Sequence, residues 1–372
     1  MSKTDETKAP KSSAGGLEGV VAAETALSRV DGAAGRLIIA GRDLPDLAET
    51  LHFEGVTAAL WSTTGKPWSA DEARTALGKA RVAAFENVPT LLEAAKGLTI
   101  TEALRVGLGL LPDTHSTEPH VRLVAAMPVF VAALARAADG KAPVAPDAGR
   151  SHAEDYLRML HGEEPAPDAI DAMDKYLVTV SDHGMNASTF TARVVASTAA
   201  EPVSSVLAAL CALKGPLHGG APGPVLDMLD DIGGTDNIEP WLREAVMAGD
   251  RLMGFGHRVY RVRDPRADVL GAAIKSLKGV EERTGFARQV EATAKAVLKE
   301  LKPHRPLDTN VEFYTALLLE ALAIPREAFT PTFAVGRVAG WTAHIMEQES
   351  TGRLIRPSAR YVGALPDDLE VA

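Results

Sequence analysis

A short basic stretch of the sequence, MGFGHRVYRVRDPRAD, extends from Met253 to Asp268. Gly254 and Gly256 precede His257, and glycines in such a place let a ligand approach the backbone closely. Arginine makes two-pronged contacts with carboxylates and phosphates. Because this is the densest basic stretch in an acidic chain, the pattern favours an anion-binding loop over an ordinary solvated loop.

Two further histidines lie between segments with helical spacing. His218 is in the turn KGPLHGGAPGP, which is rich in glycine and proline and precedes an apolar helical segment. Near a helix N-terminus its neutral form is favoured, as suits a catalytic group, but a surface position in a helix–turn–helix corner fits equally well. His183 is in SDHGMNASTFTAR, where Asn186 is typical of a helix N-cap, so a capping turn is the favoured interpretation.

Two charged residues interrupt apolar segments towards the C-terminus. Glu312 begins NVEFYTALLLEAL, where its carboxylate is either a partner for the helix dipole or a base in a dry pocket. Arg337 lies within FAVGRVAGWTAHIM. Because an unpaired buried charge is costly, Arg337 is expected to have an anionic partner, either from the protein or from a ligand.

Other kinds of site lack their residue patterns. The ten histidines form no His-Glu-x-x-His motif and no close set with cysteine, so no metal site is predicted. Phosphate-binding loops, strand-linked dinucleotide motifs and a G-x-S-x-G turn are also absent from the sequence. The single cysteine, Cys211, is interpreted as a small buried core residue, and a chain without a disulfide framework suits the cytoplasm.

The overall charge and the N-terminal sequence exclude further classes. A net charge of -10 without a basic block argues against binding to nucleic acid or to an anionic membrane. No apolar run of about 18 residues was recognised in the sequence, so no membrane span is predicted. The opening MSKTDETKAPKSSAGG resembles neither a secretory signal nor a transit peptide, and residues 1–16 are expected to be a disordered polar tail.

Helices must position these candidate residues, because aromatic residues are only 5% of the chain and alanine and leucine are frequent. Asp31 and Gly32 mark the turn of a small β-hairpin near the N-terminus. More charged helices then separate two apolar zones. We expect a large helical domain of residues 17–219 and 323–372, a small helical domain of residues 220–322, and a site in the cleft between them.

Four segments, in this order and spacing, resemble the citrate synthase family: GPLHGG, MGFGHRVYRVRDPRAD, NVEFYTALLL and RLIRPSARYVG. The resemblance extends from about Leu17 to Gly363. It implies a mainly α-helical two-domain fold and a homodimer that acts in the tricarboxylic acid cycle. It also implies an acyltransferase that condenses acetyl-CoA with oxaloacetate and hydrolyses citryl-CoA without a metal or prosthetic group. The alternatives are a 2-methylcitrate synthase that uses propionyl-CoA and a weakly active or non-catalytic dimer.

The resemblance also implies a role for each candidate residue. Glu312 would remove a proton from the acetyl methyl group, His218 would stabilise the resulting enol, and His257 would hold and protonate the oxaloacetate carbonyl. The expected oxaloacetate contacts are both of these histidines with His183, Arg266, Arg337 and, from the second subunit, Arg356. The expected CoA contacts are Arg251, Leu252, Met253, Gly254, Phe255 and Gly256.

The sequence departs from the family pattern in two places. The family usually has aspartate where this chain has Glu312. One extra methylene moves the carboxylate by more than about 1 Å, and a misplacement of about 1 Å can cost about 100-fold in rate. The sequence GGAPGP replaces the more usual Gly-Gly-Ala-Asn-Glu after His218. Because Pro222 can begin a helix, we expect this second change to affect only the next turn.

Overall fold

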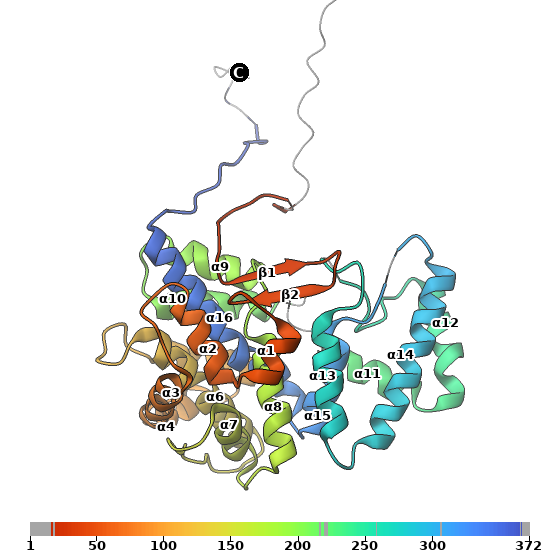
Figure 1. Ribbon diagram of the computed structural model, residues 1–372, viewed down its shortest axis with the longest axis horizontal. Coiled ribbons are helices and arrows are strands. Elements are labelled where there is room, and N and C mark those ends of the chain that lie inside the picture. The colour runs from red at the N-terminus through yellow and green to blue at the C-terminus, as the bar shows by residue number, and fades with distance from the viewer. Residues whose placement is uncertain are drawn as a thin grey trace, which may run out of the picture.

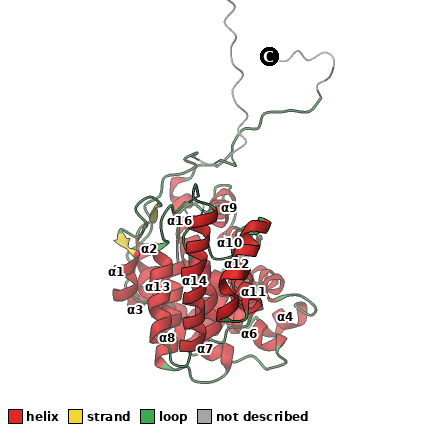
Figure 2. Cartoon of the chain, turned by 90° about the vertical axis from the view of Figure 1, so that its right-hand side faces the viewer, coloured by secondary structure: helices red, strands yellow, loops and turns green. Residues whose placement is uncertain are grey.

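The computed structural model describes residues 16–17, 19–215, 217–218, 222–257, 259–305, 307–364 and 366. The tail predicted for residues 1–16 therefore lies outside the described residues, apart from Gly16. The fold is mainly helical, as expected, with one small sheet (Figure 2). The helices from the N-terminal half of the chain are α1 (Leu44–Thr50), α2 (Phe53–Ser62), α3 (Ala70–Phe85), α4 (Val88–Ala94), α5 (Ile100–Gly109), α6 (Pro119–Ala138), α7 (His152–His161) and α8 (Pro167–Val180). They are followed by α9 (Ala187–Ala196), α10 (Pro202–Leu213), α11 (Pro222–Ile232), α12 (Ile238–Ala248), α13 (Pro265–Ser276), α14 (Glu281–Leu301), α15 (Val311–Ala321) and α16 (Phe329–Thr351), with short 3-10 helices η1 (Thr235–Asn237) and η2 (Arg326–Ala328).

The predicted N-terminal hairpin is confirmed. Strand β1 (Ser28–Asp31) pairs antiparallel with β2 (Arg36–Ile39), and β3 (Arg42–Asp43) adds a third, short strand. The tip of the hairpin contacts the basic loop, since the Arg261 amide donates to the Gly32 carbonyl at 2.9 Å. A Cβ on Gly32 would lie 2.2 Å from the Val259 carbonyl oxygen, so only glycine permits this approach. The hairpin thus supports the loop that follows His257.

Helix α6 lies in the core and packs against α3, α5, α7 and α16. By length and composition this helix could cross a membrane, although no membrane span is predicted from the sequence. However, 83% of its most apolar 18-residue window is buried inside the protein, as in the core helix of a globular fold. The apolar middle of this helix therefore packs in the protein core.

Helix α16 passes closely over the end of α8. A Cβ on Gly336 would lie 2.5 Å from Val180, and a Cβ on Gly340 would lie 2.3 Å from the Ser181 carbonyl oxygen. The two glycines let the backbones approach until the Gly340 amide donates to that carbonyl at 3.1 Å. This contact brings Arg337, which lies between them on α16, beside the segment that leads to His183.

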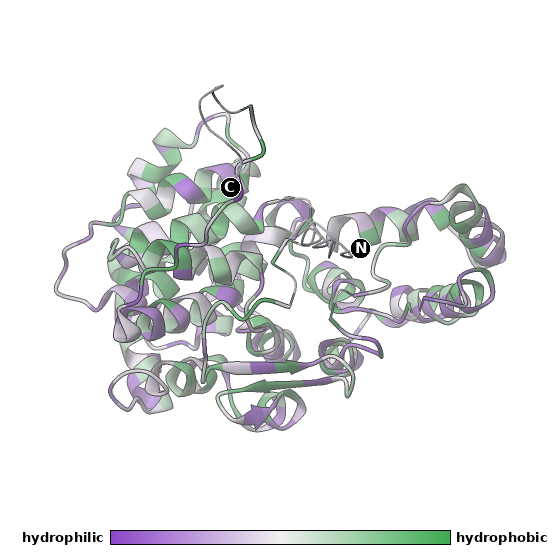
Figure 3. Cartoon of the chain, turned by 90° about the horizontal axis from the view of Figure 1, so that it is seen from above, coloured by the Kyte–Doolittle hydropathy of each residue, from purple (hydrophilic) through white to green (hydrophobic). Residues whose placement is uncertain are grey.

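Helices α11, α12 and α14 are grouped on one side of the molecule, beyond α13 and α15 (Figure 1). The view from above in Figure 3 shows a group of helices projecting from the body of the molecule on that side. Within this group α12 packs on α14 and α11 packs on α15, while α13 packs on both α15 and α8. Helix α11 begins at Pro222, as expected of the altered turn after His218. The boundaries proposed for the large and small domains, at residues 219–220 and 322–323, stay predictions.

The interpretation of Cys211 as a core residue is wrong, because its side chain is exposed on α10. The inward face of α10 carries Val206, Leu210 and Leu213 instead. Apolar residues surround almost the whole of this helix, so their spacing did not distinguish its buried face from its exposed one.

Candidate active site

The glycine loop before His257 is fixed to the start of α15. The Gly256 amide donates to the Asp308 carbonyl at 2.8 Å, and the Asn310 amide donates to the Gly254 carbonyl at 2.9 Å. Both glycines have positive φ, +84° and +82°. A Cβ on Gly254 would lie 2.8 Å from the Cβ of Phe313, so glycine is required there on two grounds. The loop and the first turn of α15 therefore form one unit.

The ring of His257 is held in a defined tautomer. Its Nδ1 accepts hydrogen bonds from the amides of Val259 at 3.0 Å and Tyr260 at 3.1 Å. Burial and the neighbouring Arg266 cation lower the pKa of His257 to about 4. The ring is consequently neutral near pH 7, with its proton on Nε2. His257 can donate this proton to a ligand.

Arg266 lies in the first turn of α13 and is paired with Asp264, the N-cap of that helix. Its Nε and Nη2 lie 3.0 Å and 2.7 Å from the two carboxylate oxygens. Although burial opposes the charge, Asp264 raises the pKa of Arg266. Nη2 also lies 3.5 Å from Nε2 of His257. Both of these atoms are donors, so they converge on a place suited to an acceptor.

Arg337 is the second buried cation of the cluster, and its side chain is only 2% exposed. Its Nε donates to the Val180 carbonyl at 2.6 Å, and its guanidinium lies 4.7 Å from the ring centre of Phe333. Its Nη2 is buried and has no hydrogen-bond partner in the part of the chain that the structure describes. Burial lowers the pKa of Arg337 to about 10, which leaves it charged near pH 7. The expected anionic partner is not supplied by a direct ion pair from the described residues.

His183 completes the group of potential donors. Its Nε2 lies 3.2 Å from the Tyr260 hydroxyl, and its ring centre lies 5.7 Å from that of His257. Burial, followed by Arg266 and Arg337, holds the pKa of His183 well below its ordinary value. The ring is therefore neutral, so the positive charge of the cluster belongs to the arginines.

Glu312 is the second residue of α15. Its amide donates to the N-cap Asn310 side chain at 2.9 Å, while its carboxylate receives no hydrogen bond from the described residues. Burial raises the pKa of Glu312 to about 7, against the opposing effect of Arg266 and Arg337. A carboxylate with this pKa can both accept and release a proton near neutral pH, as a general base must.

His218 precedes α11 in the chain, but its side chain lies against the N-terminus of α9. Its Nε2 accepts from the Ser188 amide at 3.1 Å and lies 2.8 Å from the Ser188 hydroxyl. Asn186 caps this helix by accepting from the Thr189 amide at 3.0 Å, which confirms the predicted capping turn. An Nε2 that accepts from a main-chain amide leaves the ring neutral with its proton on Nδ1. This agrees with the expectation of a neutral histidine near a helix N-terminus.

The protein-family model described as "Citrate synthase, C-terminal domain" matches residues 16–358. The chain belongs to the citrate synthase family. A citrate synthase of Haloferax volcanii is 38% identical over 366 residues, which cover 94% of this chain and 95% of that protein. The crystal structure of the Thermotoga maritima citrate synthase has a TM-score of 0.83 at 33% identity, covering 96% of this chain and 97% of that one. The structure of a Thermoplasma acidophilum citrate synthase in ternary complex with carboxymethyl coenzyme A and oxaloacetate has a TM-score of 0.85 at 26% identity, covering 95% of this chain and 97% of that one.

Arg356, an expected oxaloacetate contact, does not join this cluster within the chain. It lies on the C-terminal arm, residues 352–364, which extends away from the end of α16 (Figure 1). Its side chain is exposed, and the adjacent Ile355 amide donates to the Ser197 hydroxyl at 3.0 Å. The role expected of Arg356 across a dimer interface stays a prediction.

The expected CoA-binding segment forms the loop in front of His257. Leu252, Gly254 and Phe255 are buried, Met253 and Gly256 are half-buried, and Arg251 is exposed. Phe255 packs on Phe313 of α15, with ring centres 5.5 Å apart. The role of this segment in binding CoA stays a prediction.

The sequence analysis missed three polar contacts of the cluster. Tyr260 lies between His183 and His257, Asp264 pairs with Arg266, and Ser188 holds His218. Tyr260 and Asp264 were visible inside the basic motif, but nothing in their spacing indicated that they turn towards its histidine and arginine. No group of three or more His, Cys, Asp or Glu residues suited to a metal ion occurs among the described residues.

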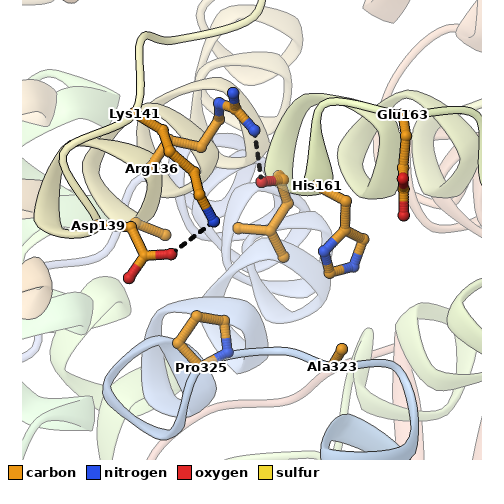
Figure 4. Close-up of a pocket in the computed structure, with 9 residues that line it drawn as sticks. Arg136, Asp139, Lys141, His161, Glu163, Ala323 and Pro325 are labelled. Carbon is orange, nitrogen blue, oxygen red and sulfur yellow. Dashed lines mark hydrogen bonds and ion pairs between the residues drawn. The ribbon is translucent and has the colours of Figure 1, made fainter.

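A cavity of about 260 Å³ lies elsewhere, between the ends of α6 and α7 and the turn before α16 (Figure 4). It shares no residue with the cluster. Its cations already have partners in the protein: Arg136 donates to the carbonyls of Ala142 and Leu160, and Lys141 pairs with Asp139 at 2.7 Å. The fold therefore accounts for its charges without a ligand.

Proposed function

We propose that the protein condenses acetyl-CoA with oxaloacetate and hydrolyses the resulting citryl-CoA to citrate and CoA. The observation that carries the proposal is the convergence of the His257 donor and the buried Arg266 and Arg337 cations beside the Glu312 carboxylate, whose pKa is about 7. This combination suits a dianionic ketoacid and a base for a weak carbon acid. The Thermoplasma relative in complex with a CoA analogue and oxaloacetate supports the same pair of substrates.

The chemistry begins with oxaloacetate held through its carboxylates by Arg266, Arg337 and His183. Its carbonyl oxygen accepts a hydrogen bond from His257 Nε2–H. Glu312 removes a proton from the acetyl methyl group while His218, through Nδ1–H, donates to the thioester oxygen and stabilises the enol. The enol carbon attacks the oxaloacetate carbonyl, and His257 protonates the new alkoxide. Water then cleaves the thioester, giving citrate and free CoA.

The proposal includes a homodimer in which Arg356 of each arm completes the site of the other subunit. Its support is that Arg356 is exposed and lies on an extended arm. We further propose a cytoplasmic enzyme of the tricarboxylic acid cycle that needs neither metal nor cofactor. Activity should then be unchanged after dialysis against a chelator, and loss of activity that added metal restores would contradict this part.

The deciding experiment measures the release of CoA thiol from purified protein with oxaloacetate, using acetyl-CoA and propionyl-CoA in parallel. We expect a higher kcat/KM for acetyl-CoA and no release when oxaloacetate is omitted. Glu312→Gln is the matched control, because it preserves the size of the side chain and removes the base. A preference for propionyl-CoA would assign the reaction to 2-methylcitrate formation. An absence of turnover, despite oxaloacetate binding, would identify a non-catalytic relative.

A further inference from the structure

A buried hydrogen-bond chain begins next to His183. Asp182 is fully buried, and its carboxylate accepts hydrogen bonds from the Ser28 hydroxyl and, at 3.3 Å, from His344 Nε2. The same Ser28 hydroxyl accepts from the Gly184 amide at 2.9 Å. The Ser28 hydroxyl thus links the two residues that flank His183, because it donates to the Asp182 carboxylate and accepts from the Gly184 amide. The orientation of the His183 loop depends on these contacts.

Arg193 of α9 determines the tautomer of His344. Its Nη1 lies 3.1 Å from His344 Nδ1, and a guanidinium can only donate. His344 Nδ1 must therefore accept, which places the ring proton on Nε2 and directs it to Asp182. Without Arg193 the proton could move to Nδ1, and His344 would then present a lone pair to the Asp182 carboxylate.

Arg193 is itself held at several points, and its side chain is only 1% exposed. It pairs with Glu347 and donates from Nε to the Gln348 side-chain oxygen at 3.0 Å. Gln348 in turn donates to the Arg353 carbonyl at 2.8 Å, at the start of the C-terminal arm. The chain of contacts therefore connects the His183 loop with the base of the arm that carries Arg356.

The same chain of contacts extends to Arg337, the second arginine expected to bind oxaloacetate. His344 follows Arg337 by seven residues on α16, which is about two helical turns, so both side chains leave the same face. Burial opposes the charge of Asp182, but His344 and Arg337 hold its pKa below the ordinary value. An ionised Asp182 in turn favours the charged form of Arg337.

We propose that Arg193 is a positioning residue for the dicarboxylate substrate: by fixing the His344 tautomer it orients Asp182, and through Asp182 it holds the His183 loop and Arg337 ready for oxaloacetate. The inference rests on the proposed function for the identity of this ligand. Arg193 touches no substrate in this scheme, and its effect passes through His344.

The test is a double-mutant cycle between Arg193→Lys and His344→Gln. Lysine keeps the positive charge beside Glu347 but cannot make all the guanidinium contacts. Glutamine keeps a nitrogen donor for Asp182 and has no ring tautomer. We expect Arg193→Lys alone to weaken oxaloacetate binding about tenfold in calorimetry, and to weaken it much less in the His344→Gln background. In steady-state assays KM for oxaloacetate should rise while kcat changes little.

His152→Asn is the matched control, because His152 is another buried histidine bonded to a buried arginine, Arg81, at 3.3 Å, in a part of the core without these contacts. It should lower the melting temperature without weakening oxaloacetate binding. Equal losses from Arg193→Lys in both backgrounds, or unchanged affinity in the single variant, would overturn the proposal.

Amide hydrogen exchange separates this inference from the proposed function. In the ligand-free protein, Arg193→Lys should speed exchange at the Gly184 amide. In the His344→Gln background, the same substitution should change this exchange rate much less. If the wild-type protein did not bind oxaloacetate, the proposed substrate would be wrong, while this exchange pattern would still report whether Arg193 positions the loop. Exchange at Gly184 that is unaffected by Arg193→Lys would refute the positioning role itself.

Discussion

Arg266 and Arg337 are both buried beside Glu312, yet Arg266 is paired with Asp264 through two nitrogens, while Nη2 of Arg337 is buried without a hydrogen-bond partner among the described residues. A paired cation is stable in the empty protein, whereas an unsatisfied one is costly. We therefore expect the two arginines to contribute differently: Arg266 is fixed in place by Asp264, and Arg337 should gain a hydrogen-bond partner when an anion binds.

Replacing Arg337 by methionine should weaken oxaloacetate binding by about 100-fold or more, because a buried charged contact to the ligand is lost. The melting temperature should change little, since removal of a costly buried charge offsets the lost bond to Val180. Calorimetry and thermal unfolding measure the two effects. Arg122→Met is the control, because Arg122 also has buried nitrogens without partners but lies outside the cluster. Equal losses of affinity in both variants would contradict the assignment.

Glu312→Gln should lower kcat by about 10²- to 10⁴-fold, the range for loss of a general base, and leave oxaloacetate binding nearly intact. Glu312→Asp should lower kcat by about 100-fold, because the site is built around the longer side chain. Single-turnover assays at saturating substrates measure both. An aspartate variant as fast as the wild type would show that the backbone does not compensate for the extra methylene.

The raised pKa of Glu312 predicts an acid limb in the activity profile. As the pH falls through about 7, Glu312 takes up a proton and can no longer act as a base, so kcat/KM should decline below that value. His257, with its pKa lowered to about 4, stays neutral over the same range. Measurements at limiting oxaloacetate, between pH 5.5 and 9, test this. A flat profile would exclude Glu312 as the titrating base.

The stability of the folded protein should depend on the ionisation of Glu312 in the opposite direction, and should fall as the pH rises. Because the folded protein holds the Glu312 proton more tightly than the unfolded chain, ionisation of Glu312 destabilises the fold as the pH rises above its unfolded pKa. Glu312→Gln should therefore raise the melting temperature more at pH 8 than at pH 5. Equal shifts at both pH values would mean that the carboxylate is not desolvated.

Subunit complementation tests the role of Arg356. The variants Glu312→Gln and Arg356→Ala should each be nearly inactive, but unfolding and refolding them together should restore about a quarter of the wild-type activity. In a mixed dimer one site then has an intact Glu312 and receives Arg356 from its neighbour. Recovery would not occur if each Arg356 served its own subunit, and a monomeric protein in solution would also refute the proposal.

The motifs, ordered by the family resemblance, predicted that His183, His257 and Arg266 lie close together. The local elements followed from simple signals. Asn186 and Asp264 act as helix N-caps, and Pro222 begins a helix, as their residue types indicate. The tautomers of His257 and His218 could not be predicted, since each is set by main-chain amides that only the folded loop brings to the ring. The prediction that Cys211 is buried was wrong for a similar reason, because an apolar helix does not specify which of its faces the neighbouring helices cover.

The close seat of Gly254 on Phe313 has a consequence for protein engineering. The glycine loop cannot separate from α15 without breaking its hydrogen bonds to Asp308 and Asn310. We therefore expect this loop, which is predicted to contact acyl-CoA, to move together with the helix that carries Glu312. We expect substitutions of Gly254, made in search of new acyl donors, to press on Phe313 and so displace the neighbouring Glu312. Changes of donor preference are better sought on surfaces that face this loop and helix than within them.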